Sequence, residues 1–418
     1  MADVRAAETP APLDLLDERL RRGDGWRAVA GGLWQRVRSG DLGALPIVLG
    51  LVVIWTVFQS LNSVFLSSAN LVNLLMESAS VGIIALGVVC VLLVGQIDLS
   101  VGSVSGLSAA LTAVTFVTHG WPLLLSMAAA LGAGALVGVV YAQMVTRLGV
   151  PSFVATLAGL LSFLGIQLWL LGDTGAINLP FESDLVHFAQ LAFLPEWLSY
   201  VLVVVAAGWL FATGYGLART RRAAGLSARS TSLLVARSTA VLLGLGFAVW
   251  YLNRARGVGW LFVSFVALVL VLHYALTRTG WGRSVFAVGG NAEAARRAGI
   301  NVRRVYTSVF VLCSTLAALG GMIAAARLAA ANQATGAGDV NLNAIAAAVI
   351  GGTSLFGGRG SAFSALLGIL VIQSISNGLT LLDLDSSFRF IITGLVLALA
   401  VTLDSVARRS RVAHGRAA

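Results

Sequence analysis

The sequence contains no lysine, and all 28 of its basic residues are arginines. The phosphate-binding loop of ATPases requires a lysine, and Schiff-base chemistry requires one as well. Neither chemistry is therefore available to this chain. If the protein takes part in a process driven by ATP, a separate chain must hydrolyse the nucleotide.

Cysteine and charge are also scarce. Cys90 and Cys313 each lie alone in an apolar run, and the four histidines are scattered, so we expect neither a disulfide nor a metal site. Charged residues make up 11% of the 418 residues, hydrophobic residues make up 58%, and the mean hydropathy is +0.89. This composition lies outside the range of soluble domains and predicts an integral membrane protein surrounded by the lipid bilayer.

Apolar runs recur that are long enough to cross about 30 Å of hydrocarbon as helices. They predict an all-α polytopic membrane protein with about 12 transmembrane helices, of which 79–95 and 341–356 are short. The expected domains are a cytoplasmic N-terminal arm over 1–43, a transmembrane domain over 44–405 and a basic cytoplasmic tail over 406–418. The expected spans are 44–65, 79–95, 100–118, 122–145, 152–172, 197–217, 233–252, 258–277, 306–330, 341–356, 361–382 and 388–405.

The arginines indicate the orientation of these spans. With a cytoplasmic N-terminus, 24 arginines fall on the cytoplasmic side and 4 on the other, as the positive-inside rule requires. We therefore expect both termini in the cytoplasm. We expect no nucleic acid partner, because the positions of the arginines are explained by the orientation of the spans in the membrane. The arm mixes both charge signs, unlike a signal peptide, and Leu13, Leu16 and Leu20 have the spacing of a short surface helix or of a solvated face.

The segment 173–196 falls on the outer side in this topology. It carries no arginine and four acidic residues, which are Asp173, Glu182, Asp184 and Glu196. The segment is either a docking surface for an external partner or an ordinary solvated loop.

A polar stretch, GQIDLSVGS at 95–103, interrupts two strongly apolar runs. Irregular backbone at membrane depth must be buried in protein or line a water-filled cavity, because lipid cannot satisfy its polar groups. Asp98 either caps the following helix by accepting its N-terminal amides or lines a translocation pathway, and both roles can hold. The candidate pathway or gate residues here are Gln96, Asp98, Ser100, Gly102 and Ser103.

A second interruption, within 351–361, has the same design: an apolar run, a small polar turn and then a helix rich in Gly, Ala and Ser. Paired interruptions in the two halves of a membrane chain indicate a repeated architecture around a central pathway. The candidate pathway or gate residues of this stretch are Gly351, Gly352, Thr353 and Ser354.

The loop 278–305 lies on the arginine-rich side and encodes a very short helix. Asn291 is a good N-cap, Glu293 and the pair Arg296 and Arg297 complement the two ends of the helix dipole, and Gly299 ends the helix. A helix of about two turns is not stable alone, so it must dock on something.

The pattern EAARRAG at 293–299 resembles the coupling-helix motif in the permease subunits of bacterial ABC importers. The stretches IDLSVGS at 97–103, VPSFVATLAG at 150–159, AVGGNAEAARRAGINV at 287–302 and AIAAAVIGGTSLFGGRGS at 344–361 resemble the monosaccharide branch of that family. In this family the coupling helix fits a groove of the ATPase. The residues that the resemblance assigns to this contact are Asn291, Glu293, Ala294, Ala295, Arg296, Arg297 and Gly299.

The resemblance implies a homodimer in the bacterial inner membrane that works with a cytoplasmic ABC ATPase and a periplasmic sugar-binding protein. ATP and Mg would bind the ATPase, and this chain would be a transport subunit without enzymatic activity. The stretches 219–237 and 376–386 most resemble the D-xylose members of the branch. Gln96 departs from the usual residue of the branch, and 381–390 departs from its D-xylose members. The alternatives are another sugar, such as ribose or galactose, or an ion-coupled sugar carrier that uses Glu77, Asp98 and Arg237.

Overall fold

A computed structural model describes residues 45–385 and, beyond them, residues 387, 388, 390–392, 394, 395, 398 and 402. The predicted N-terminal arm with its Leu13–Leu20 helix, the basic tail and most of the last expected span lie outside the described residues. The described chain divides into two compact units, one with residues 194–257 and one with residues 45–193 and 258 onward.

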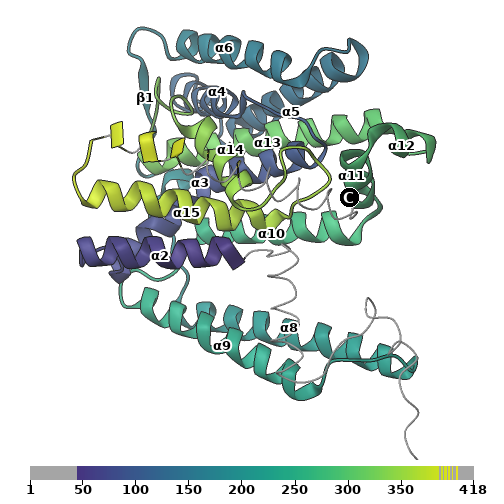
Figure 1. Ribbon diagram of the computed structural model, residues 1–418. Coiled ribbons are helices and arrows are strands. Elements are labelled where there is room, and N and C mark those ends of the chain that lie inside the picture. Colours follow the sequence, from purple (N-terminus) through teal and green to yellow (C-terminus); the bar gives the residue numbers. More distant parts are fainter. Residues whose placement is uncertain are drawn as a thin grey trace, which may run out of the picture. The chain divides into compact units, whose positions relative to one another are not determined.

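Helices form nearly all of the larger unit (Figure 1). Its only sheet, within the described residues, is an antiparallel pair of short strands, β1 (Ala176–Asn178) and β2 (Ala330–Asn332). The helices are α2 (Leu45–Leu61), α3 (Ser68–Leu93), α4 (Val101–Ala113), its continuation η1 (Val114–Thr118), α5 (Leu123–Arg147), α6 (Ser152–Leu171), α7 (Asp184–Gln190), α10 (Trp260–Arg278), α11 (Gly280–Gly290), α12 (Ala292–Arg297), α13 (Val302–Leu328), α14 (Val340–Ile350) and α15 (Ala362–Leu381).

The smaller unit is a helical hairpin of α8 (Glu196–Ala223) and α9 (Thr231–Asn253). Its turn is held by Arg221, whose Nε donates to the carbonyl of Ser227 at 2.7 Å. At the other end, the side-chain amide of Asn253 donates to Ser199 Oγ at 3.2 Å. Most of the side chains of both helices are exposed, as expected for helices that face lipid.

Within the described residues, nine helices are long and apolar enough to cross a membrane. This confirms the prediction of an all-α polytopic membrane protein. The expected start of the second span is wrong, however, because α3 begins at Ser68 and runs for 26 residues. Polar residues hid its first turns from a hydropathy scan, and neighbouring helices satisfy them: Asn70 bonds to Asn377 at 2.7 Å, and Glu77 accepts a bond from Gln373 at 2.7 Å.

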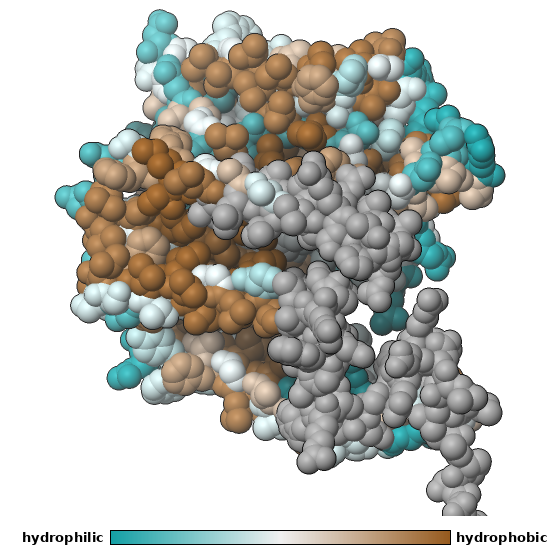
Figure 2. All heavy atoms as spheres, in the orientation of Figure 1, coloured by the Kyte–Doolittle hydropathy of each residue, from teal (hydrophilic) through white to brown (hydrophobic). Residues whose placement is uncertain are grey.

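The core of the larger unit lies around α3, α4 and α13, which are buried over most of their length. Close helix contact depends on small residues. A Cβ on Gly87 of α3, for example, would lie 2.9 Å from the carbonyl oxygen of Cys313 on α13. The outer helices instead expose large apolar side chains such as Leu161 and Trp169 of α6, and apolar side chains cover much of the surface in Figure 2.

The strand β1 lies at the end of the larger unit opposite α11 and α12 (Figure 1), together with its partner β2. Gln190 of α7 donates to the carbonyls of Ala326 and Arg327 at 3.0 Å each, which fixes α7 to the end of α13. The segment after Asp173 is therefore folded onto the helix ends. Its role as a docking surface stays a prediction.

Candidate coupling and gate site

The first interruption begins where α3 ends. The amide of Gly95 donates to the carbonyl of Leu92 at 2.9 Å, and the amide of Gln96 donates to the carbonyl of Val91 at 3.1 Å. Gly95 has φ +72°, in the left-handed region that glycine adopts without strain. The chain thus leaves α3 sharply and enters an irregular segment over 96–100.

Side chains of other elements satisfy the backbone of this irregular segment. Ser152 Oγ of α6 accepts from the amide of Ile97 at 3.3 Å, and Thr156 Oγ1 accepts from the amide of Leu99 at 3.1 Å. The carbonyl of Leu99 accepts from Asn341 Nδ2 of α14 at 2.7 Å. Backbone groups at membrane depth need such partners. No sequence pattern indicates this role for Ser152, Thr156 or Asn341, although the first two lie in the stretch 150–159.

Asp98 is buried, with 1% of its surface exposed. Its Oδ1 accepts from the amide and the hydroxyl of Ser100, at 2.8 and 2.7 Å, and its Oδ2 lies 3.8 Å from the thiol of Cys313. The bonded amide belongs to the residue before the first helical residue of α4, so the carboxylate orders the turn into the helix instead of capping its first-turn amides. A contact between Asp98 and a transported molecule stays a prediction.

The other candidate residues of this stretch contact α13, the stretch itself and α14. Gln96 Nε2 donates to the hydroxyl of Tyr306 on α13 at 3.4 Å, and Ser103 Oγ donates to the carbonyl of Ser100 at 3.0 Å. A Cβ on Gly102 would lie 3.1 Å from that of Asn341. The irregular segment is therefore packed against α13, and the start of α4 is packed against α14 and, at Gly336, against the segment that leads into it.

That segment, 333–339, follows β2 as irregular backbone and runs beside α4 and α6. Gln167 of α6, which is fully buried, donates to the carbonyls of Asn332 and Thr335 at 3.0 and 2.9 Å. The segment ends at α14, which has 11 residues, so the expectation of a short helix here is confirmed. Gln167 could not be singled out from the sequence, because one amide in an apolar run carries no information about its partners.

The second interruption follows α14. The amide of Thr353 donates to the carbonyl of Ala348 at 3.0 Å, and the amide of Ser354 donates to the carbonyl of Arg359 at 3.0 Å, which closes the turn. Gly351 is buried against the carbonyl of Ser364 on α15, whereas Gly352 is exposed. The hydroxyl of Thr353 is buried and has no hydrogen-bond partner among the described residues.

The two interruptions meet each other and the end of α11 at a cluster of glycines. We call Gly95, Gly289, Gly290, Gly357 and Gly358 the glycine junction.

Backbone contacts define this junction. The amide of Gly358 donates to the carbonyl of Leu93, the last residue of α3, at 2.9 Å. A Cβ on Gly357 would lie 2.8 Å from the carbonyl oxygen of Gly289 and 2.9 Å from the amide nitrogen of Gly95. A Cβ on Gly289 would overlap the carbonyl of Leu93. No side chain separates the backbone of these segments.

The short helix α12 begins directly after the junction. Asn291 Oδ1 accepts from the amide of Ala294 at 2.9 Å, which makes Asn291 the N-cap. Gly299 follows with φ +84° and ends the helix. Of the two alanines assigned to partner contact, Ala294 is exposed, whereas Ala295 is buried beneath the helix. The helix has 6 residues, close to the expected two turns.

Charges cover the outer side of α12. Glu293 pairs with Arg296 at 3.1 Å and with Arg297 at 3.3 Å, and all three side chains are more than half exposed. Pairs of this kind contribute little to stability, about 0.3–0.5 kcal/mol each. The three charges are therefore free to exchange these partners for those of another protein.

The helix α11 links α12 to the membrane helices. Thr279 Oγ1 caps α11 by accepting from the amide of Gly282 at 3.3 Å, and Trp281 Nε1 donates to Ser308 Oγ of α13 at 2.8 Å. Val285 and Val288 of α11 are buried. A movement of α12 would thus be transmitted to the glycine junction, which directly precedes it in the chain. The same movement would be transmitted to α13 through α11.

Another polar group lies nearer the β1–β2 end of the membrane helices. Glu77 of α3 accepts from Gln373 and lies 3.9 Å from Arg327 of α13, and both charged side chains are partly exposed. Of the other ionisable residues considered for an ion-coupled carrier, Asp98 is buried at the first interruption, and Arg237 is exposed on α9 of the smaller unit.

Interrupted membrane helices that meet a short exposed helix are the features of a transport permease. The chain belongs to the family described as branched-chain amino acid transport system / permease component, whose model matches residues 70–401. The predicted membership of a family of transport permeases is therefore confirmed.

Curated relatives show which transport permeases this chain is similar to. The xylose transport system permease protein XylH of Escherichia coli K12 is 35% identical over 383 residues, which cover 90% of this chain and 95% of the relative. XylH of Haemophilus influenzae is 33% identical and covers 88% of this chain and 98% of its own. The ribose import permease protein RbsC of Escherichia coli K12 is 31% identical, with coverage of 86% and 92%. No solved structure matches the chain.

Proposed function

We propose that this chain is the membrane permease subunit of an ABC importer that carries D-xylose across the bacterial inner membrane. The observation that carries the proposal is the 35% identity to a xylose permease over 90% of the chain. Ribose is the second candidate, since a ribose import permease is 31% identical over 86% of the chain. Transport of either sugar would use the same mechanism.

The proposed partners follow from the family and from the exposed helix. A separate cytoplasmic ABC ATPase binds ATP and Mg, a periplasmic protein delivers the sugar, and two copies of this chain form the pathway. The helix α12 is the proposed contact with the ATPase, through Asn291, Glu293, Ala294, Arg296 and Arg297. Its support is physical: a helix of 6 residues is too short to persist alone, and its outer side presents charges to solvent.

The glycine junction is the proposed link between the ATPase and the gate. A ligand or partner shifts a two-state element only through differential binding to the two states. If the ATPase binds α12 in two positions, the backbone at Gly289 moves with it. Gly289 lies against the backbone of Leu93, at the first interruption, and against the backbone of Gly357, in the second. Both interruptions would therefore move with Gly289. The pathway residues proposed to respond are Gln96, Asp98, Ser100, Gly102, Ser103, Gly351, Gly352, Thr353 and Ser354.

The proposed orientation puts α12 and both chain termini in the cytoplasm and the junction at the cytoplasmic ends of the membrane helices. Within the larger unit, α3, α5 and α10 end near this face, and α4, α6 and α13 begin there, so that Arg147, Arg278, Arg303 and Arg304 all lie on one side. This agreement between helix direction and arginine position supports the positive-inside assignment.

Uptake of labelled xylose into proteoliposomes tests the proposal. The vesicles contain the permease, its ATPase and the binding protein, and ATP is supplied on the side of the ATPase. We expect uptake that requires ATP and all three proteins, and competition by unlabelled xylose over ribose. An ATPase variant that binds but does not hydrolyse ATP is the matched control. Uptake driven by an ion gradient without the ATPase would overturn the ABC assignment, and preferred competition by ribose would overturn the sugar.

A further inference from the structure

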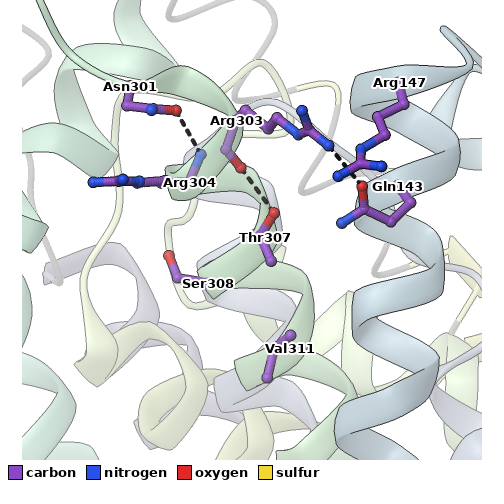
Figure 3. A pocket seen from close by; sticks show the side chains of 8 residues that line it. All are labelled: Gln143, Arg147, Asn301, Arg303, Arg304, Thr307, Ser308 and Val311. Carbon is purple, nitrogen blue, oxygen red and sulfur yellow. Dashed lines mark hydrogen bonds between the residues drawn. The ribbon is translucent and has the colours of Figure 1, made fainter.

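A cavity of about 510 Å³ lies between the end of α5 and the start of α13. Figure 3 shows it from close by: α5 contributes Gln143 and Arg147, and the first turns of α13 contribute the rest. The other lining residues are Asn301, the N-cap of α13, and Arg303, Arg304, Thr307, Ser308 and Val311 of the helix itself.

The polar end of this cavity carries uncompensated positive charge. Arg303 Nη2 donates to Gln143 Oε1 at 2.9 Å, and Arg147 lies beside them on the same side of α13 (Figure 3). Gln143 is neutral, so its bond does not balance the guanidinium charge. Among the described residues, no carboxylate forms an ion pair with Arg147, Arg303 or Arg304. Like charges held together without a counter-charge repel, and an anion in the cavity would relieve this repulsion.

The cavity lies at the membrane boundary, because it joins the last turn of one membrane-length helix to the first turns of another. Val311 is nine residues into α13, roughly 14 Å from its start at a rise of 1.5 Å per residue. The arginines are therefore at headgroup level, whereas Val311 lies at the depth of acyl chains. A free phosphate ion would use only the charged end.

Apolar surface continues from the cavity along α5. Leu136, Val140, Gln143 and Arg147 follow at intervals of three and four residues, so they share one face of the helix. Leu136 is 63% exposed and Val140 is 46% exposed. This face of α5 thus runs from an arginine at its end to a strip of exposed apolar side chains, as the surface beside a phospholipid would.

We propose that the cavity binds the phosphate of an anionic phospholipid, with Arg147 and Arg303 as its main ligands and the acyl chains along Leu136 and Val140. Guanidinium groups suit this role, because they bind phosphate oxygens through two parallel hydrogen bonds. Basic pockets at the ends of membrane helices are known to select such headgroups. The assignment of the site to the cytoplasmic leaflet rests on the orientation given under the proposed function, whereas lipid binding itself does not.

A lipid at this position would act next to α12. Only residues 298–301 separate α12 from α13, and Arg303 lies in the first turn of α13. A bound phosphate would hold the start of α13 against α5 through Arg303 and Arg147. The base of α12 would then be firmer with the lipid than without it.

Retention of lipid by the purified full-length permease tests the proposal. Intact-protein mass spectrometry and thermal unfolding are measured with phosphatidylglycerol, phosphatidylcholine or inorganic phosphate added. The test variant is Arg147→Gln/Arg303→Gln. The control, Arg278→Gln/Arg283→Gln, removes the same charge from exposed positions at the same end of the larger unit.

We expect the native chain and the control variant to retain phosphatidylglycerol and to gain thermal stability from it, and phosphatidylcholine to have a smaller effect. The test variant should bind phosphatidylglycerol ~10-fold or more weakly, because it lacks both guanidinium groups that bind the phosphate. Equal retention by the test and control variants would overturn the site. Full stabilisation by inorganic phosphate alone would assign the cavity to a soluble anion.

The remaining comparison is the amount of ATPase that co-purifies with each of the two variants. If the test variant retains phosphatidylglycerol normally but loses the ATPase, the arginines bind the partner protein, and the lipid proposal is wrong. Failure of xylose uptake by the native chain would affect only the proposed function, because lipid retention is measured without sugar or ATP.

Discussion

Replacement of Gly357 by alanine is the most direct test of the glycine junction. The new Cβ would lie 2.8 Å from the carbonyl oxygen of Gly289, 2.9 Å from the amide nitrogen of Gly95 and 3.0 Å from its Cα. All three atoms belong to the backbone, so no side chain can rotate away. Gly357 also has φ +85°, where an alanine is strained.

The expected cost follows from these two effects. A left-handed backbone costs a residue with a Cβ about 1–2 kcal/mol, and overpacking of a tight contact costs about 1–3 kcal/mol. Together they give roughly 2–5 kcal/mol against the closed junction. An opening of this size would separate Gly358 from Leu93 and disconnect α12 from both interruptions.

Sugar uptake and ATP hydrolysis are measured in parallel in proteoliposomes, together with thermal unfolding. We expect Gly357→Ala to lose most of its uptake while the ATPase still hydrolyses ATP, which is the signature of uncoupling. Two controls separate the causes. Gly290→Ala adds a methyl group at the same place but meets nothing within 4 Å, and Gly120→Ala has a similar φ of +65° in open space. Uptake and stability in Gly357→Ala equal to those of both controls would refute the role of the junction.

Three further outcomes are expected. Asp98→Asn should fold, because its side-chain oxygen can still accept from Ser100, and failed uptake by this folded variant would support a pathway role; loss of folded protein would instead show that the charge is needed for the turn. Ser152→Ala/Thr156→Val should lower the unfolding temperature, since each unpaired backbone amide costs about 1–3 kcal/mol, and an unchanged temperature would contradict the assigned bonds. Glu293→Ala and Gly299→Leu should each reduce ATP-driven uptake at normal expression, and transport with normal ATPase co-purification would contradict the coupling role of α12.

Composition and local signals were enough to predict much of the fold. Hydropathy located most helix ends to within a few residues, because the outer helices carry long apolar runs. The caps at Asn291 and Gly299 defined α12 with no information from elsewhere in the chain. The start of α3 could not be found in this way, since Asn70 and Glu77 reduce the local hydropathy and their partners are about 300 residues away.

The junction itself was beyond sequence analysis of a single chain. Glycines at 95, 289 and 357 each indicate a local turn, but nothing in any of the three stretches indicates that the other two lie against it. The same limit applies to Ser152 and Thr156, whose hydroxyls look like ordinary polar residues of a helix start. Their role depends on irregular backbone more than 50 residues earlier in the chain.

The bond between Gly358 and Leu93 has a use for measurement. Its donor and acceptor come from distant parts of the chain, so the amide proton of Gly358 exchanges slowly with solvent only while the segments are together. Hydrogen exchange at this one position would therefore report how long the junction stays closed, without any label or substitution. A comparison of the exchange rate of the Gly358 amide with and without nucleotide would show how opening of the junction changes during the transport cycle.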